Sequence, residues 1–256
     1  MDSGIGLLAA ATAVRRLRPD ADLVLSSDPG SMPWGPRTPE DVTARALAVA
    51  EAAARLDPAA LIVACNTASV RALSALRDRL EPGVPVVGTV PAIKPAAAGG
   101  GPLAIWATPL TTGSPYQRNL IREFAHGVSV TEVPCPGLAD AVEHADQAAV
   151  DAAIAAAAAR TPEDVTTVVL GCTHYELVAE RIREAVQQPG RPPLVLHGSA
   201  GAVAAQALRR IGELPDPDAP ATGSLTVLLG GREGTLPESA LAYEEGRLLQ
   251  AVSPAG

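Results

Sequence analysis

The chain has 256 residues, a formal net charge of −8 and a sequence pI near 5.0. This length can bury a large hydrophobic core in one or two domains. The acidic balance provides no basic face, which argues against nucleic acid as a partner. The N-terminal residues lack a basic stretch followed by an apolar run, so we expect no signal peptide. The longest apolar-looking run, residues 148–159, is interrupted by Asp151 and is too short to span a bilayer, so we expect no membrane association.

The chain contains three cysteines. An odd number argues against a disulfide framework, and no two cysteines have the C-x-x-C spacing of a zinc site. The cysteines therefore predict a reduced, cytoplasmic protein without a metal ion.

Apolar periodicity and turn residues predict alternating strands and helices along the chain. In chain order we expect a helix over 7–17, a strand over 22–27, a Gly- and Pro-rich loop over 29–39, a helix over 39–56, a strand over 61–64, a helix over 68–76, strands over 84–88 and 103–107, a helix over 116–125, a strand over 128–133, helical segments over 137–159, a strand over 168–171, a helix over 175–182, a strand over 193–196, a helix over 200–211, a loop over 215–222 and a strand over 225–229. Such repeats predict an α/β fold in which right-handed crossovers connect parallel strands.

Two of the cysteines occupy closely similar settings, one in each half of the chain. Cys65 follows an apolar run and precedes Asn66, and Cys172 follows a second apolar run and precedes Thr173. Each thiol is therefore expected at the carboxyl end of a parallel strand, where open α/β sheets hold their ligands. Two matched thiols suggest a reaction that needs one acid/base group on each side of a carbon atom.

Six motifs carry a resemblance that runs from Asp2 to about residue 208. They are Asp2-Ser3-Gly4-Ile5-Gly6, Pro33-Trp34-Gly35, Val63-Ala64-Cys65-Asn66-Thr67-Ala68, Gly88-Thr89-Val90-Pro91-Ala92-Ile93-Lys94-Pro95, Ala107-Thr108 with Thr111, and Gly171-Cys172-Thr173-His174-Tyr175. In this order and near these spacings they resemble the glutamate racemase family, within the wider aspartate/glutamate racemase group.

The resemblance implies a cofactor-independent racemase that interconverts L- and D-glutamate and supplies D-glutamate for peptidoglycan. It also implies two similar flavodoxin-like domains whose parallel sheets face an interdomain cleft. The C-terminal segment would return to the first domain. The implied boundaries are 1–93 plus 201–256 for the first domain and 94–200 for the second.

The chemistry explains why the reaction needs two thiols. The α-proton of an amino acid is a very weak acid, and racemisation must remove it from one face and return a proton to the other. A free thiol has a pKa of roughly 8.5, and a helix N-terminus lowers it. We therefore expect Cys65 and Cys172 to serve as a thiolate/thiol pair near neutral pH. Each cysteine taken singly could instead be a small buried apolar residue.

Other site residues follow from the resemblance. Asp2 resembles an acid beside the first thiol, and His174 and Glu143 resemble the groups that assist the second. The structural alternatives are a surface or capping histidine for His174 and a solvated helix carboxylate for Glu143. Helix N-termini bind anions, which suits the two carboxylates of glutamate. The expected substrate-binding residues are Asp2, Ser3, Pro33, Trp34, Gly35, Asn66, Thr67, Thr111, Thr173 and His174.

Several features depart from the family pattern. The family has a strand before the Asp-Ser-Gly turn, whereas Asp2 is the second residue here. We expect a chain extended upstream by about six to ten residues, a strand's length, to be more stable and more active. Leu7 replaces a glycine, and Trp34 replaces a tyrosine.

Two alternatives for the function stay open, namely a racemase for another amino acid or a hydantoin, and a catalytically weak binding relative. The oligomeric state is open, with a homodimer as one option.

Overall fold

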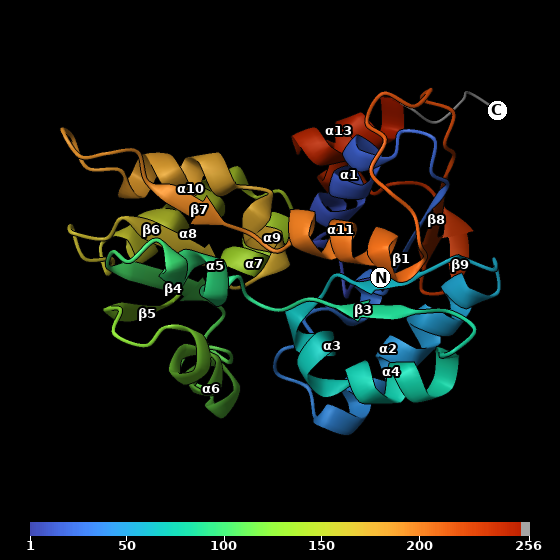
Figure 1. The fold of residues 1–256 in the computed structure, drawn as a ribbon, viewed down its shortest axis with the longest axis horizontal. Coiled ribbons are helices and arrows are strands. Elements are labelled where there is room, and N and C mark those ends of the chain that lie inside the picture. The colour runs from blue at the N-terminus through green and yellow to red at the C-terminus, as the bar shows by residue number, and fades with distance from the viewer. Residues whose placement is uncertain (252–256) are drawn as a thin grey trace. The chain divides into compact units, whose positions relative to one another are not determined.

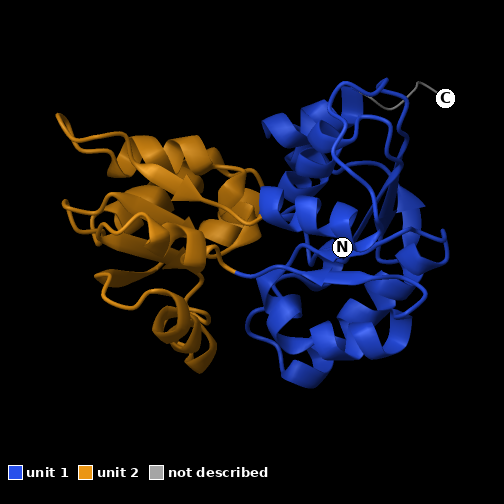
Figure 2. Cartoon of the chain, viewed as in Figure 1, with its two compact units in different colours: residues 1–90, 200–256 blue, residues 91–199 orange. Residues whose placement is uncertain are grey.

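The computed structural model describes residues 1–251 and divides into two compact units (Figures 1 and 2). Unit 1 consists of Met1–Val90 and Ala200–Gly256, and unit 2 consists of Pro91–Ser199. The two α/β domains predicted for residues 1–93 with 201–256 and for 94–200 stay a prediction, as does the cleft between them. Within the described part of the chain, no helix is long and apolar enough to cross a membrane.

Unit 2 is built on one four-stranded sheet. Its elements are α5 (Ile93–Ala98), β4 (Leu103–Ala107), α6 (Pro115–Phe124), β5 (Val130–Pro134), α7 (Leu138–Glu143), α8 (Gln147–Ala158), β6 (Thr167–Leu170), α9 (Thr173–Glu176), α10 (Ala179–Val186) and β7 (Val195–His197). The strand order is β5-β4-β6-β7, and every neighbouring pair is parallel. All five residues of β4 are buried, as expected for a central strand of a parallel sheet covered by helices.

Unit 1 contains the remaining elements. They are α1 (Leu7–Leu17), β1 (Leu23–Ser27), the 3₁₀ helix η1 (Pro29–Ser31), α2 (Pro39–Ala54), β2 (Leu61–Val63), α3 (Asn66–Arg71), α4 (Leu73–Leu80), β3 (Val86–Gly88), α11 (Ala200–Arg210), β8 (Leu225–Leu229), β9 (Arg232–Gly234), α12 (Glu238–Leu241) and α13 (Glu244–Ala251). Thr38 caps α2 by accepting a hydrogen bond from the N–H of Asp41, and Pro39 occupies the first turn of this helix.

The strands of unit 1 form two separate ladders, β1-β8-β9 and β2-β3. Met1 and Asp2 lie between them. Asp2 forms a parallel bridge with Ser27 at the end of β1, and the Met1 carbonyl accepts a hydrogen bond from Ala64 N–H just after β2. These two residues therefore connect the ladders at one end only.

The α/β fold with parallel sheets predicted from the sequence is confirmed. Two details differ from the prediction. Strand β9 pairs antiparallel with β8. The single helix predicted after each cysteine is a pair of short helices, α3 with α4 and α9 with α10. The helical segments predicted over 137–159 are α7 and α8, and Asp146 caps the second of them by accepting a hydrogen bond from Ala149 N–H.

Candidate active site

Cys65 occupies the junction between β2 and α3 in unit 1. It has extended backbone angles in the N-cap position of α3, and its side chain is buried. The thiol therefore lies at the carboxyl end of a parallel strand and at the N-terminus of a short helix, as the sequence predicts. Asn66 and Thr67 form the first turn of the same helix.

Asp2 and Ser3 both influence the pKa of the Cys65 thiol. Burial raises the pKa of Cys65 well above its usual value, and the charge of Asp2 together with a hydrogen bond to its carboxylate raises it further. Backbone N–H groups of Ala68 and Ser3 lower the pKa by less. The lowered pKa predicted for a thiol at a helix N-terminus is therefore wrong for Cys65, because burial and a neighbouring carboxylate outweigh the N–H groups. At neutral pH this thiol holds its proton.

A second pair of residues fixes the end of β2. The hydroxyl of Thr89 donates to the carbonyl of Val63 at 2.7 Å, and the hydroxyl of Ser69 donates to the same carbonyl at 3.2 Å. Ser69 Oγ also accepts a hydrogen bond from Thr89 N–H at 2.9 Å. These bonds tie the turn that carries Cys65 to the end of β3. Neither hydroxyl is among the site residues predicted from the sequence, although Thr89 belongs to the Gly88-Thr89 motif.

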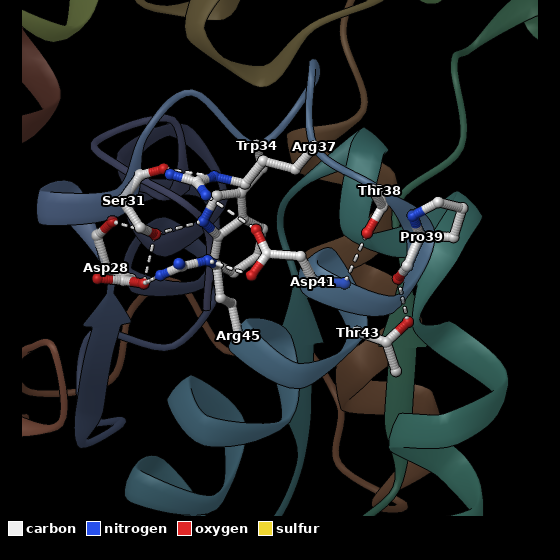
Figure 3. A network of polar contacts seen from close by, with 9 residues as sticks. All are labelled: Asp28, Ser31, Trp34, Arg37, Thr38, Pro39, Asp41, Thr43 and Arg45. Atoms are coloured by element: carbon white, nitrogen blue, oxygen red, sulfur yellow. Dashed lines mark hydrogen bonds and ion pairs between the residues drawn. The ribbon is translucent and has the colours of Figure 1, made fainter.

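The loop that carries Pro33, Trp34 and Gly35 is held by a polar network (Figure 3). Trp34 is only 2% exposed, and its indole Nε1 donates to Ser31 Oγ at 2.8 Å. Ser31 Oγ in turn donates a hydrogen bond to the Asp28 carboxylate. The indole belongs to the buried core cluster that also includes Cys65. Trp34 is thus a core residue of unit 1, and the substrate contact predicted for it stays a prediction.

Two arginines complete this network. Arg45 contacts the carboxylates of Asp28 at 3.4 Å and Asp41 at 3.0 Å. Arg37 pairs with Asp41 at 2.8 Å and donates to the Ser31 carbonyl at 2.9 Å. The loop is therefore fastened to the first turns of α2 at both of its ends (Figure 3).

In unit 2, Cys172 occupies the matching junction between β6 and α9. Its Sγ lies 3.9 Å from Nδ1 of His174, which is on the first turn of α9. Nε2 of the same histidine lies 2.8 Å from Oε2 of Glu143, the last residue of α7. His174 and Glu143 are both buried, whereas Cys172 is partly exposed. A thiol, an imidazole and a carboxylate thus form a chain that can move a proton and orient the ring that moves it.

The loop after β4 lies at the same edge of this sheet as Cys172. Trp106 is opposite Leu170, and Gly171 N–H donates to the Trp106 carbonyl at 2.7 Å, so the residues that follow β4 and β6 lie side by side. The hydroxyls of Thr108 and Thr111 lie 3.2 Å apart in this loop. A Cβ at Gly171 would come within 2.8 Å of the Trp106 carbonyl oxygen, so this approach requires glycine.

Within each unit, the structure brings most of the predicted site residues together. In unit 1, Asp2, Ser3 and Cys65 cluster with the first turn of α3. In unit 2, Glu143, Cys172, Thr173 and His174 cluster, and Thr111 lies at the same sheet edge. Over residues 1–251, no group of three histidine, cysteine or acidic side chains is arranged to hold a metal ion.

Three comparisons relate the chain to known proteins. Residues 7–205 match the family model described as Asp/Glu/Hydantoin racemase. A glutamate racemase of Roseiflexus sp. is 40% identical over 190 residues, covering 71% of this chain and 68% of that protein. A glutamate racemase of Salmonella gallinarum is 35% identical over 207 residues, covering 78% of this chain and 72% of that protein.

Solved structures of similar proteins show the same fold. The glutamate racemase of Escherichia coli, in complex with L-glutamate and the activator UDP-MurNAc-ala, matches with a TM-score of 0.77 and 29% identity, covering 98% of this chain and 93% of that one. The glutamate racemase of Thermus thermophilus, in complex with beta-chloro-D-alanine, matches with a TM-score of 0.67 and 26% identity. The match covers 95% of this chain and 90% of that one.

Proposed function

Because the chain belongs to the Asp/Glu/Hydantoin racemase family, we propose that it interconverts L- and D-glutamate by proton transfer through Cys65 and Cys172, without a metal or an organic cofactor. The names of similar proteins support glutamate as the substrate, as does the L-glutamate bound in the Escherichia coli structure. The single observation that carries the proton chemistry is the chain of contacts from Cys172 through His174 to Glu143.

In the direction from L- to D-glutamate, the Cys172 thiolate removes the α-proton from one face of the substrate. His174 takes up and returns protons at this sulfur, and Glu143 orients the imidazole and favours its protonated form. The electron pair left on the α-carbon is delocalised into the adjacent carboxylate. Cys65, which holds its proton at neutral pH, donates it to the opposite face.

The reaction leaves the Cys172 side protonated and the Cys65 side as a thiolate. The two sulfurs return to their starting states by exchanging protons with solvent, or the reverse reaction starts from D-glutamate at Cys65. Asp2 contributes on this side, because a carboxylate that holds the thiol in its protonated form also makes the thiolate a stronger base.

Substrate carboxylates would be bound by N–H groups at the starts of α3 and α9, together with the hydroxyls of Ser3, Thr67, Thr111 and Thr173. We further propose that the D-glutamate serves peptidoglycan synthesis. The enzyme would act in the cytoplasm, because the cytoplasm keeps thiols reduced.

The test is to replace each thiol by serine and to follow glutamate by circular dichroism and by ¹H NMR in D₂O. Cys65→Ser and Cys172→Ser should each lower racemisation by at least about 10²-fold, because a hydroxyl is a far weaker acid than a thiol. Each variant should still exchange the α-proton of one enantiomer without inverting it. By family resemblance, Cys65→Ser should exchange L-glutamate and Cys172→Ser should exchange D-glutamate.

Cys135→Ala provides the matched control, because this third thiol is buried and its Sγ lies 3.5 Å from the Val133 carbonyl in the core of unit 2. Its racemisation should stay within about twofold of wild type once the folded fraction is equal. Wild-type turnover in either serine variant would show that the two-thiol mechanism is wrong. Faster turnover of aspartate or of a hydantoin would instead correct the substrate.

A further inference from the structure

Two side-chain hydroxyls meet one backbone carbonyl at the point where β2 ends. Thr89 Oγ1 donates to the Val63 carbonyl at 2.7 Å, and Ser69 Oγ donates to the same oxygen at 3.2 Å. Ser69 Oγ also accepts a hydrogen bond from the Thr89 N–H at 2.9 Å. Val63 and Thr89 are 0% and 1% exposed, so both are shielded from solvent. These three hydrogen bonds are called the hydroxyl bridge below.

The hydroxyl bridge lies where the ladder between β2 and β3 would continue. Leu61 N–H donates to Pro85 O, which sets the backbone groups that pair along these two parallel strands. With this pairing, the next rung of the ladder joins the Thr89 N–H to the Val63 carbonyl. A carbonyl oxygen has two lone pairs, and here two hydroxyls donate to it. Ser69 Oγ therefore serves both groups of that rung, because it donates to one and accepts from the other.

Ser69 holds the chain on both sides of the bend that carries the thiol. Its side chain bonds to the carbonyl of Val63, the last residue of β2, and its backbone N–H donates to the carbonyl of Cys65 at 2.8 Å. Ala64 alone separates these two residues in the chain. The position of Cys65 relative to the β2-β3 ladder is thus set by Ser69 and, through the shared carbonyl, by Thr89.

Helix α3 needs such an anchor because it is short. It has six residues, Asn66–Arg71. A helix of this length is not stable on its own, so contacts with the rest of unit 1 must hold it in place. A displacement of about 1 Å at a reacting group can lower a rate by about 10²-fold. The hydroxyl bridge is therefore placed to control proton transfer at Cys65.

We propose that Ser69 and Thr89 are positioning residues for Cys65 in the proposed racemisation, on which this inference rests. The hydroxyl bridge fixes the bend at Ala64 and so holds the thiol where it exchanges a proton with one face of the substrate. Loss of the bridge should leave proton transfer at Cys172 unchanged, because that thiol follows β6 in the separate sheet of unit 2.

The test compares two substitutions of one residue. Thr89→Val removes the hydroxyl and keeps the shape of the side chain, whereas Thr89→Ser keeps the hydroxyl and removes the methyl group. In D₂O, Thr89→Val should slow the initial rate of α-proton exchange by about tenfold or more for the enantiomer of glutamate that is deprotonated at Cys65. Exchange of the enantiomer that is deprotonated at Cys172 should stay within about twofold of wild type. Thr89→Ser should restore the lost rate, and Ser69→Ala should reproduce the one-sided defect.

Thr12→Val is the matched control, because Thr12 is a buried residue of α1 whose hydroxyl lies 3.5 Å from the Glu245 carbonyl. It applies the same substitution to another element of unit 1. Both exchange rates should stay within about twofold of wild type once the folded fraction is equal. The same one-sided defect in Thr12→Val would show that a general loss of stability, rather than loss of the hydroxyl bridge, impairs Cys65.

A second readout needs no glutamate. The rate of Cys65 alkylation by iodoacetamide at pH 8, followed by peptide mass spectrometry, should rise by about threefold or more in Thr89→Val, because a loosened bend exposes the buried thiol. Thr89→Ser should return this rate to that of wild type. Unchanged exchange in Thr89→Val, or equal slowing for both enantiomers, would overturn the proposal. If the wild-type protein exchanges neither enantiomer of glutamate, the proposed function fails, and the alkylation rates then decide whether the hydroxyl bridge positions the thiol.

Discussion

Oε2 of Glu143 lies 2.8 Å from Nε2 of His174, and both side chains are buried, so the carboxylate holds the imidazole with its other nitrogen facing Cys172. Glu143 comes from the end of α7 and His174 from α9, and these helices contact each other in unit 2. The pair thus links the thiol at the end of β6 to the carboxylate at the end of α7.

Replacing Glu143 by glutamine should lower kcat/KM for glutamate by about 10- to 10³-fold, because a neutral amide no longer favours the protonated imidazole. The equilibrium constant between enantiomers is 1, so kcat/KM must fall equally in both directions. A measurement of α-proton exchange in D₂O therefore identifies which of the two thiols is impaired. Exchange should slow for the enantiomer that is deprotonated at Cys172.

Glu184→Gln is the matched control for this change, because Glu184 is an exposed carboxylate on α10. It should leave both exchange rates unchanged. A Glu143→Gln enzyme with wild-type kcat/KM would show that the carboxylate only packs between α7 and α9.

Asp2→Asn should lower the pKa of the Cys65 thiol, because the Asp2 charge and its hydrogen bond both raise it. Burial remains the larger cause, so the pKa should stay above that of a free thiol. The rate of Cys65 alkylation by iodoacetamide at pH 8, followed by peptide mass spectrometry, should therefore rise while racemisation falls. Asp78→Asn, at an exposed position of α4, should change neither rate. Slower alkylation in Asp2→Asn would contradict the assignment of Asp2 as a neighbour of this thiol.

Ser31→Ala should destabilise unit 1 by about 1–3 kcal/mol, because it leaves the buried indole N–H of Trp34 without an acceptor. Urea unfolding followed by tryptophan fluorescence measures the change. Ser74→Ala, at an exposed position of α4, controls for the loss of a hydroxyl and should shift stability by less than about 0.5 kcal/mol. An unchanged midpoint in Ser31→Ala would mean that water or another group satisfies the indole.

The sequence predicts the elements that periodicity and caps determine locally. The helix over 7–17 and the strands over 103–107 and 225–229 match the structure residue for residue. The positions of Cys65 and Cys172 at the junction of a strand and a helix could also be predicted. Each cysteine follows an apolar strand and precedes a residue that starts a helix.

Details that depend on packing between distant segments could not be predicted. The raised pKa of Cys65 arises from burial and from Asp2, which is 63 positions away in the chain (65 − 2). The bonds that join Ser69 and Thr89 to Val63 need β2 and β3 side by side. The burial of Trp34 in the core depends on the network around Asp28 and Arg45, which no local pattern indicates.

The amine of Met1 makes the stability of the chain depend on pH. Burial lowers the pKa of this amine from 8.0 to about 6, and the charge of Asp2 opposes the shift by less. The unfolded chain therefore binds more protons than the folded chain between pH 6 and pH 8, and the free energy of unfolding should rise with pH across this window. A shift of about two pKa units corresponds to roughly 2–3 kcal/mol, fully present above pH 8 and lost by pH 6. Urea titrations at pH 6, 7 and 8 would measure it, with the Nα-acetylated chain as the control because its amide does not titrate. Equal pH slopes for the two chains would show that the amine is solvated rather than buried between β1 and β2.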